Sequence, residues 1–125
     1  MDHRSRYLSL ATYRASGAEV ATPVWFAPVG ATLYVFTAAD SGKVKRLGRS
    51  PRARVAPCDA RGHVRGPWQA ASARLVTDPA VIRGADAALG RKYGWQKRLL
   101  DLGSRVTGRI HRRAWIAIDV EIVTP

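Results

Sequence analysis

Cysteine is nearly absent from this chain of 125 residues, which has only Cys58. One cysteine excludes an intrachain disulfide framework and a cysteine-rich zinc site. A chain of this length needs neither, because it can bury about two thirds of its unfolded surface. The scarcity of cysteine favours a reducing compartment, and we expect a cytoplasmic protein with a single domain over residues 1–125.

Long apolar runs are also missing. The first twenty residues include three arginines and no continuous apolar stretch, so we expect no signal peptide. Residues 20–39 are uncharged and about long enough to span a bilayer. Pro23, Pro28 and Gly30 interrupt this segment, however, and two strands with a turn fit it better than a transmembrane helix. We therefore expect no membrane partner.

Acidic residues are scarce: 9 Asp and Glu stand against 21 Lys and Arg, which gives a net charge of +12. Residues 41–65 hold eight cations against Asp59 alone, and residues 91–113 hold eight against Asp101 alone, so each segment carries 8 − 1 = +7. Two basic segments on a near-neutral body suggest an anionic partner. A solvated surface that only keeps the protein soluble explains them equally well.

Hydrophobic alternation and turn signals predict a mainly β chain with a few helices. The first three expected strands, with short turns between them, form an antiparallel meander. About six antiparallel strands in so short a chain favour a barrel. Strands are expected at 7–13, 19–27, 32–37, 53–58, 68–76 and 114–123, and helices at 43–49, 79–93 and 96–102, with a loop at 103–108.

The most informative stretch runs from Thr37 to Leu47, where a strong strand leads into a helix start that carries a hydroxyl, a glycine and three cations. A helix N-terminus with Ser41 and Lys43 can hold a phosphate, and Arg46 can bind one through two parallel hydrogen bonds. An ordinary capped surface helix has the same spacing. The residues alone leave both interpretations open.

Further pieces make the chain recognisable over about residues 7–120. Thr37-x-x-x-Ser41-x-Lys43 resembles the phosphate-binding stretch of split-barrel flavoproteins of the pyridoxamine phosphate oxidase class. One branch of that class, the F420-dependent oxidoreductases, is similar in several more segments. These are Leu10-Ala11-Thr12-Tyr13-Arg14, residues 20–26, Lys43-Val44-Lys45-Arg46-Leu47 with Ser50-Pro51-Arg52, Cys58-Asp59-Ala60-Arg61-Gly62, Gly66-Pro67-Trp68 and Lys92-Tyr93-Gly94.

The resemblance implies a split β-barrel that forms a homodimer, with the deazaflavin coenzyme F420 at the dimer interface. It gives the basic segments a use, because F420 carries an anionic phosphodiester and an oligoglutamate tail. The cofactor-binding residues that it implies fall into three groups. They are Thr37, Ser41, Gly42, Lys43 and Arg46 for the phosphate, Thr22, Pro23, Val24 and Trp25 beside the ring system, and Gly66, Pro67 and Trp68 over the ring.

The chain departs from the oxidase pattern at Gly42, where that pattern has an arginine between the serine and the lysine. It also lacks the upstream arginine that helps to hold the phosphate of FMN, which disfavours FMN and pyridoxamine phosphate chemistry. Trp25 and Trp68 can stack on a ring or belong to the core, and the sequence leaves this open.

The implied reaction is hydride transfer from the reduced deazaflavin to an electron-poor small molecule such as a quinone, an unsaturated lactone or a tetrapyrrole. We expect no catalytic side chain and no metal, because His3, His63 and His111 are isolated and Cys58 fits a buried strand. One alternative is an FMN- or haem-binding protein, or a cofactor carrier, without fast turnover. A nucleic-acid binder is less favoured, because no RNA-recognition or helix-turn-helix pattern is present.

Overall fold

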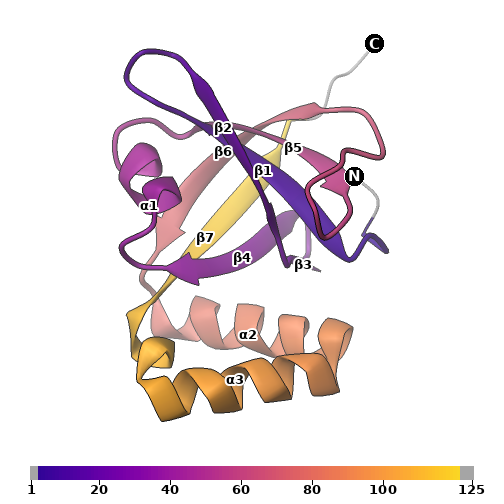
Figure 1. The fold of residues 1–125 in the computed structure, drawn as a ribbon, viewed down its shortest axis with the longest axis vertical. Helices are drawn as coiled ribbons and strands as arrows, with labels where there is room; N and C mark the ends of the chain where they lie inside the picture. The colour runs from indigo at the N-terminus through magenta and orange to yellow at the C-terminus, as the bar shows by residue number, and fades with distance from the viewer. Residues whose placement is uncertain (1–2, 122–125) are drawn as a thin grey trace.

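Seven antiparallel strands form one curled sheet in the computed structural model, which describes residues 3–121 (Figure 1). Along the sheet they lie in the order β2-β1-β5-β6-β7-β4-β3. The expected class, mainly β with a few helices around a curled antiparallel sheet, is confirmed. The strands are β1 (Tyr7–Tyr13), β2 (Glu19–Val24), β3 (Ala27–Val29), β4 (Thr32–Ala38), β5 (Arg52–Cys58), β6 (Gln69–Val76) and β7 (Arg113–Val120).

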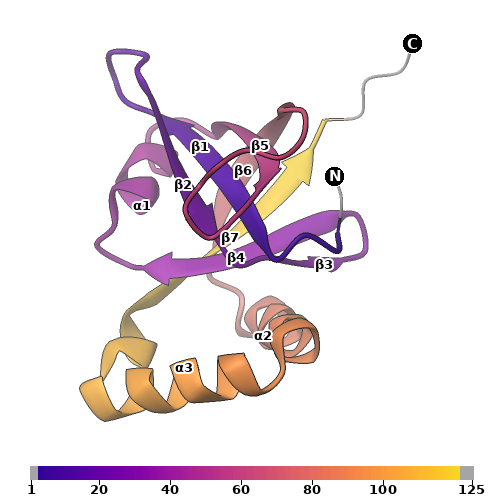
Figure 2. The same ribbon diagram turned by 45° about the vertical axis from the view of Figure 1, so that its right-hand side comes forward.

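The expected strand over 19–27 is two strands, because the chain leaves the sheet at Trp25 and Phe26. β2 pairs with β1 at one edge of the sheet, and β3 pairs with β4 at the other. The expected meander over the first three strands is therefore wrong. Since three residues span at most about 11 Å, the two edges come close together here, and the sheet curls into a nearly closed barrel (Figure 2).

The inside of the barrel is the main core. Alternate residues of the central strands point inward, and those at its centre are fully buried: Leu8, Leu10, Val35, Val55, Ile116 and Ile118. Strand β7 is buried on both faces, because its outward Trp115 packs with residues of a helix beneath the sheet. The expected last strand ran to residue 123; β7 ends at Val120, and residues 122–123 lie outside the described residues.

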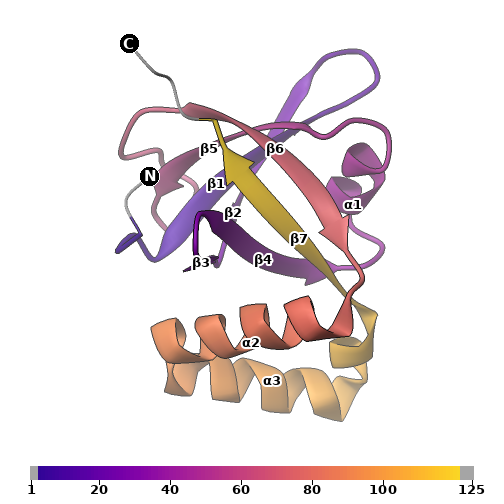
Figure 3. The ribbon, with the colours of Figure 1, turned by 180° about the vertical axis from the view of Figure 1, so that it is seen from behind.

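Two long helices, α2 (Pro79–Tyr93) and α3 (Trp95–Thr107), lie side by side beneath the sheet (Figure 3). As the sequence indicated, Asp78 caps α2, and its carboxylate accepts from the backbone N–H of Ala80 at 2.9 Å. A short helix α1 (Gly42–Leu47) lies between β4 and β5, and a 3₁₀ turn η1 (Arg109–Arg112) leads into β7. In residues 3–121, no helix combines the length and the apolarity that crossing a bilayer requires.

Helix α3 corrects two expectations, a helix ending at residue 102 and a loop over 103–108. Gly103 lies where the expected helix ends, and a glycine inside a helix costs about 1 kcal/mol. Tertiary contacts outweigh this cost: the guanidinium of Arg113 binds Asp101 on one side of the glycine and Ser104 on the other. The helix instead ends at Gly108, which has a φ of 77°.

Candidate functional site

The predicted phosphate-binding stretch forms one corner of the barrel, where β4 ends and α1 begins. The Ser41 hydroxyl oxygen accepts from the Thr37 hydroxyl at 3.4 Å and from the backbone N–H of Val44 at 3.5 Å. Both of its lone pairs are then used, and its own O–H is left to donate to a ligand. Helix α1 has only six residues, so its terminus adds little, and the side chains must supply the charge.

Arg46 occupies the space above Gly42. An ideal Cβ at Gly42 would lie 2.5 Å from the Nη1 of Arg46, so the missing side chain makes room for this guanidinium. The Nε of Arg46 donates to the hydroxyl of the fully buried Thr12 at 2.6 Å, which fixes its direction. Thus, where the oxidase pattern has an arginine, this chain brings in a guanidinium from the next helical turn.

Positive charge accumulates at this corner without compensation. Burial, and then the neighbouring charges of Arg14 and Arg49, lower the pKa of Arg46. Burial, and then the charge of Arg46, lower the pKa of Lys43. Within residues 3–121 none of these four cations forms an ion pair with a carboxylate. We call Arg14, Lys43, Arg46 and Arg49 the α1 cation cluster, and a bound anion would relieve its repulsion.

The residues expected beside the ring system lie on β2 and at the corner that follows it. The Thr22 side chain shares the inner face of the sheet with Leu10, the residue opposite it on β1. The hydroxyl oxygen of Thr22 is buried and has no hydrogen bond to any described residue. Val24 is buried in the core, and Pro23 is exposed. The half-buried Trp25 stacks on Tyr93, with ring centroids 4.3 Å apart and planes 8° apart.

The third predicted group lies in the connection between β5 and β6. An ideal Cβ at Gly62 would be 3.7 Å from Pro23, so this connection approaches β2. Trp68 is half-buried beneath the guanidinium of Arg54, at 4.1 Å from the ring centroid. Both predicted aromatic residues therefore have one ring face in contact with their own chain. Together with the exposed Pro67, these residues border β2, apart from the α1 corner.

A cleft of about 620 Å³ opens elsewhere, between the end of β4 and the last turns of α3. Of the predicted cofactor-binding residues it includes only Thr37. The floor is formed by residues 36–40, and the walls by Leu100, Ser104, Arg109, Arg112 and Arg113. One feature of the sequence points to this cleft, the second basic segment at 91–113, but no motif links that segment to the end of β4.

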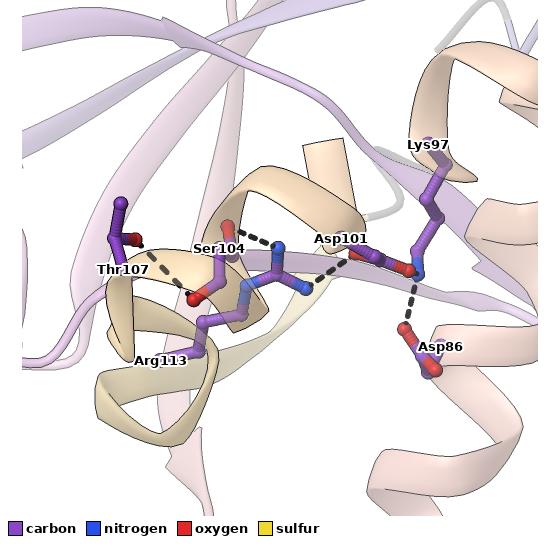
Figure 4. Close-up of polar contacts among 6 residues, drawn as sticks. All are labelled: Asp86, Lys97, Asp101, Ser104, Thr107 and Arg113. Carbon is purple, nitrogen blue, oxygen red and sulfur yellow. Dashed lines mark hydrogen bonds and ion pairs between the residues drawn. The ribbon is translucent and has the colours of Figure 1, made fainter. Parts of the chain in front are cut away.

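One wall of this cleft is held by a network of charges (Figure 4). Arg113 donates to Asp101 at 2.8 Å and to Ser104 at 3.0 Å, and Lys97 binds Asp101 at 2.7 Å. Burial raises the pKa of Asp101, but hydrogen bonds from Lys97 and Arg113 outweigh it and keep that pKa below its usual value. Arg113 is thus committed to structure, whereas Arg109 and Arg112 are exposed.

The structure corrects one interpretation of the histidines. His63 is not isolated: its Nδ1 lies 3.1 Å from an Asp59 carboxylate oxygen. The same carboxylate accepts the backbone N–H groups of His63 and Arg61, which together with the nearby ring lower the pKa of Asp59 to about 2. This is an exposed turn. Cys58 is buried, as expected. The described part of the chain contains no group of three or more His, Cys, Asp or Glu side chains that could hold a metal ion.

Comparison with known proteins finds one matching family model and several solved structures with a similar fold. The model of the family "Pyridoxamine 5'-phosphate oxidase" matches residues 3–124. A search of curated proteins finds no match. Among solved structures, a conserved hypothetical protein of Mycobacterium tuberculosis is 22% identical with a TM-score of 0.70, over 94% of this chain and 74% of that one.

Two further structures share the fold at low identity. The haem storage protein HutZ of Vibrio cholerae is 14% identical with a TM-score of 0.72, over 98% of this chain and 87% of its own. A FAD-binding protein of Mesorhizobium loti is 19% identical with a TM-score of 0.61, over 96% and 84%. At such identities the likeness establishes the split-barrel fold, and the relatives' ligands belong to those proteins.

Proposed function

This chain belongs to the pyridoxamine 5'-phosphate oxidase family, and from that membership we propose that it is a reductase that uses the deazaflavin coenzyme F420. In this proposal the α1 cation cluster holds the anionic part of the cofactor, and an electron-poor small molecule accepts the hydride. The reducing cytoplasm is the location that we propose for it.

The observation that carries the proposal is the α1 cation cluster together with the free O–H of Ser41. Lys43 and Arg46 follow Ser41 in the same helix, Arg14 and Arg49 interact with Arg46, and none of the four forms an ion pair with a carboxylate of residues 3–121. The Ser41 hydroxyl oxygen is already held by Thr37 and Val44. Charge-assisted hydrogen bonds to a phosphodiester are among the stronger polar contacts. The replacement of the family's arginine by Gly42 changes the shape of this corner while a guanidinium remains, which supports a ligand other than FMN.

In this proposal, the ring system of the cofactor is bound between two copies of the chain. The cleft between β4 and α3 contains neither the predicted ring-binding residues on β2 and in the β5–β6 connection nor any member of the α1 cation cluster. We propose that a second copy packs against this face and completes the site, so that the protein is a homodimer with the cofactor between subunits. Trp25 and Trp68 then offer their remaining ring faces at the border of that site.

The bound cofactor supplies the chemistry, a hydride from its reduced ring. The residues of this chain bind, orient and exclude water. Lys43 and Arg46 fix the phosphodiester end, while the strands β1 and β2 give a rigid wall against which the ring can be held at reaction distance. The acceptor gains the hydride and one proton, and solvent can supply that proton because no side-chain acid is needed.

A titration of the purified protein with F420, FMN and haem, at low and high salt, tests the proposal. We expect tight and salt-sensitive binding of F420. Lys43→Ala should weaken it by roughly 10- to 100-fold, since a hydrogen bond to a charged group contributes about 1.5–3 kcal/mol. Lys45→Ala is the matched control: it removes the same charge from the same helix, but Lys45 is exposed and lies about 200° around the helix from Lys43.

Two outcomes would overturn the proposal. Equal effects of the two substitutions would mean that only net charge matters at α1. Preference for FMN or haem would instead favour a flavin- or haem-binding protein. If F420 binds, reduction of a panel of quinones, lactones and tetrapyrroles then separates an enzyme from a carrier.

A further inference from the structure

Helix α3 has its polar side inside and its apolar side outside. The side facing the protein carries Lys97, which is only 3% exposed, with Asp101 and Ser104. Lys97 binds Asp86 of α2 at 2.5 Å and Asp101 at 2.7 Å, so ion pairs hold α3 in place (Figure 4). This is the reverse of an ordinary surface helix, which buries its apolar stripe.

Large apolar side chains cover the outer side. They recur at steps of four, three and four residues, which places them within about 60° of arc at 100° per residue. The stripe is therefore continuous along roughly 16 Å of helix at 1.5 Å per residue. Its members, which we call the α3 stripe, are Trp95, Leu99, Leu102 and Val106, and they are 67%, 59%, 60% and 80% exposed.

Folding does not explain this pattern. The α3 stripe remains mostly exposed among residues 3–121, and the helix is anchored by charges instead. Single exposed apolar residues are normal, but a contiguous stripe in a water-exposed protein marks an interaction surface. A chain that needed only a stable helix at this position could carry polar residues there without loss.

Cations border the α3 stripe. Arg98 and Arg105 lie about 60–80° around the helix from Trp95 at 100° per residue, and both are exposed. Arg109 and Arg112 follow in η1, also exposed. Between residues 87 and 118 the only acidic residue is Asp101, which is turned toward Lys97 and Arg113. The surface is thus apolar, with cations along one side of the helix and uncharged residues such as Gln96 and Gly103 along the other.

We propose that α3 is a membrane-docking helix, which lies in the headgroup region of an anionic phospholipid bilayer with its stripe inserted. Apolar residues on one face beside arginines are the pattern of interfacial helices. Thirteen residues span only about 20 Å, less than the roughly 30 Å hydrocarbon core, so the helix lies flat. The earlier expectation of no membrane partner considered only segments that cross a bilayer.

A second copy of the chain fits this surface less well. Antiparallel pairing of two α3 stripes would place the Arg98 and Arg105 borders of both copies near one another. The stripe also covers an area of only about 16 by 10 Å, far below the roughly 800 Å² per partner of a stable interface. The bilayer requires neither like-charge contact nor a large area. This proposal does not depend on the deazaflavin.

Flotation of the full chain with vesicles tests it. We expect binding to vesicles of phosphatidylcholine and phosphatidylglycerol at 7:3, and at least tenfold weaker binding to phosphatidylcholine alone. Because a chain of charge +12 binds any anionic surface to some extent, the deciding variants leave the charge unchanged. Leu99→Gln with Leu102→Gln should weaken binding at least tenfold. Leu75→Gln with Val64→Gln, at positions 41% and 42% exposed outside α3, should not.

Two more readouts distinguish insertion from adsorption. Arg98→Gln with Arg105→Gln should weaken binding roughly 30-fold, about fivefold for each arginine near the surface. The emission of Trp95, isolated as the difference between the wild type and Trp95→Phe, should shift to the blue with anionic vesicles. The proposal would be overturned if the Leu99→Gln, Leu102→Gln variant bound vesicles as well as the Leu75→Gln, Val64→Gln control. An unchanged emission maximum of Trp95 would also overturn it. Loss of a concentration-dependent dimer on changing Leu99 and Leu102, without loss of vesicle binding, would assign the stripe to a second copy.

Discussion

Changing Tyr93 to Phe should weaken the corner that closes the barrel. The Tyr93 hydroxyl accepts from the backbone N–H of Phe26 at 2.9 Å and donates to the carbonyl of Arg6 at 2.8 Å. Phe26 is fully buried, and in the described part of the chain its N–H has no other acceptor. The substitution removes one oxygen and leaves the stack on Trp25 in place.

The expected loss of stability follows from the backbone N–H of Phe26, which loses its acceptor in Tyr93→Phe. A buried N–H left without a partner costs about 1–3 kcal/mol, and the lost bond to Arg6 adds about 1 kcal/mol. We therefore expect the free energy of unfolding to fall by roughly 2–4 kcal/mol, a large part of the 5–15 kcal/mol that is typical of a domain. Urea unfolding at fixed protein concentration measures it as a lower midpoint with an unchanged m value.

Alkaline pH gives a second test of the same contact. Burial raises the pKa of Tyr93 to about 12 from an ordinary 10.0, although a hydrogen bond from Phe26 acts against this. The folded state thus holds this proton more tightly than the unfolded state. Its contribution is complete below pH 10 and is lost as the pH rises from 10 to 12. Tyr93→Phe should lack this loss.

The control is Tyr34→Phe, since the Tyr34 hydroxyl has no hydrogen bond within residues 3–121 and its ring packs against the same cluster. That substitution should change the free energy of unfolding by less than about 0.5 kcal/mol. If Tyr93→Phe lies within this range, or shows the wild-type fall between pH 10 and 12, the closure of the barrel does not depend on the hydroxyl.

Two further predictions concern the β5–β6 connection. Gly66→Ala should destabilise the fold by about 1–3 kcal/mol, because the new Cβ would lie 2.7 Å from Cγ of the rigid Pro57 ring, whereas Gly84→Ala, with open space in α2, should be neutral or stabilising in thermal unfolding. Asp59→Ala should make the fold less stable than the wild type above pH 4. This difference in stability should shrink as the pH falls from 4 toward 2, because the carboxylate of Asp59, whose pKa is lowered to about 2, becomes protonated and no longer stabilises the turn. A pH-independent difference in urea midpoint would contradict the second.

Local signals predicted most elements well. The expected strand over 7–13 has the bounds of β1, and the Asp78-Pro79 pair begins α2 where expected. In both cases the information lies within a few residues of the element, in alternation or in a cap. Local signals did not predict the break at Trp25 and Phe26, since the Tyr93 hydroxyl that accepts the Phe26 N–H lies 67 residues further along the chain from Phe26.

The candidate site, too, was predictable only where its residues lie close together in the sequence. Thr37, Ser41 and Lys43 lie within one short stretch of the sequence, and in the structure the Thr37 hydroxyl donates to the Ser41 hydroxyl. The role of Gly42 was not predictable, since it depends on a side chain that returns from the next turn toward Thr12 on another strand. The cleft beside α3 joins segments some 70 residues apart, and no periodicity reports such a meeting.

The two edge strands have a consequence for self-association. Strand β2 contains Pro23 and strand β3 contains Pro28, so each edge of the sheet includes a residue without an N–H to donate. A further strand from another molecule would meet a gap in the donor row at either edge, which protects the barrel from ordered aggregation. Self-association by strand addition, including growth of a fibril, is therefore disfavoured at both edges of the sheet.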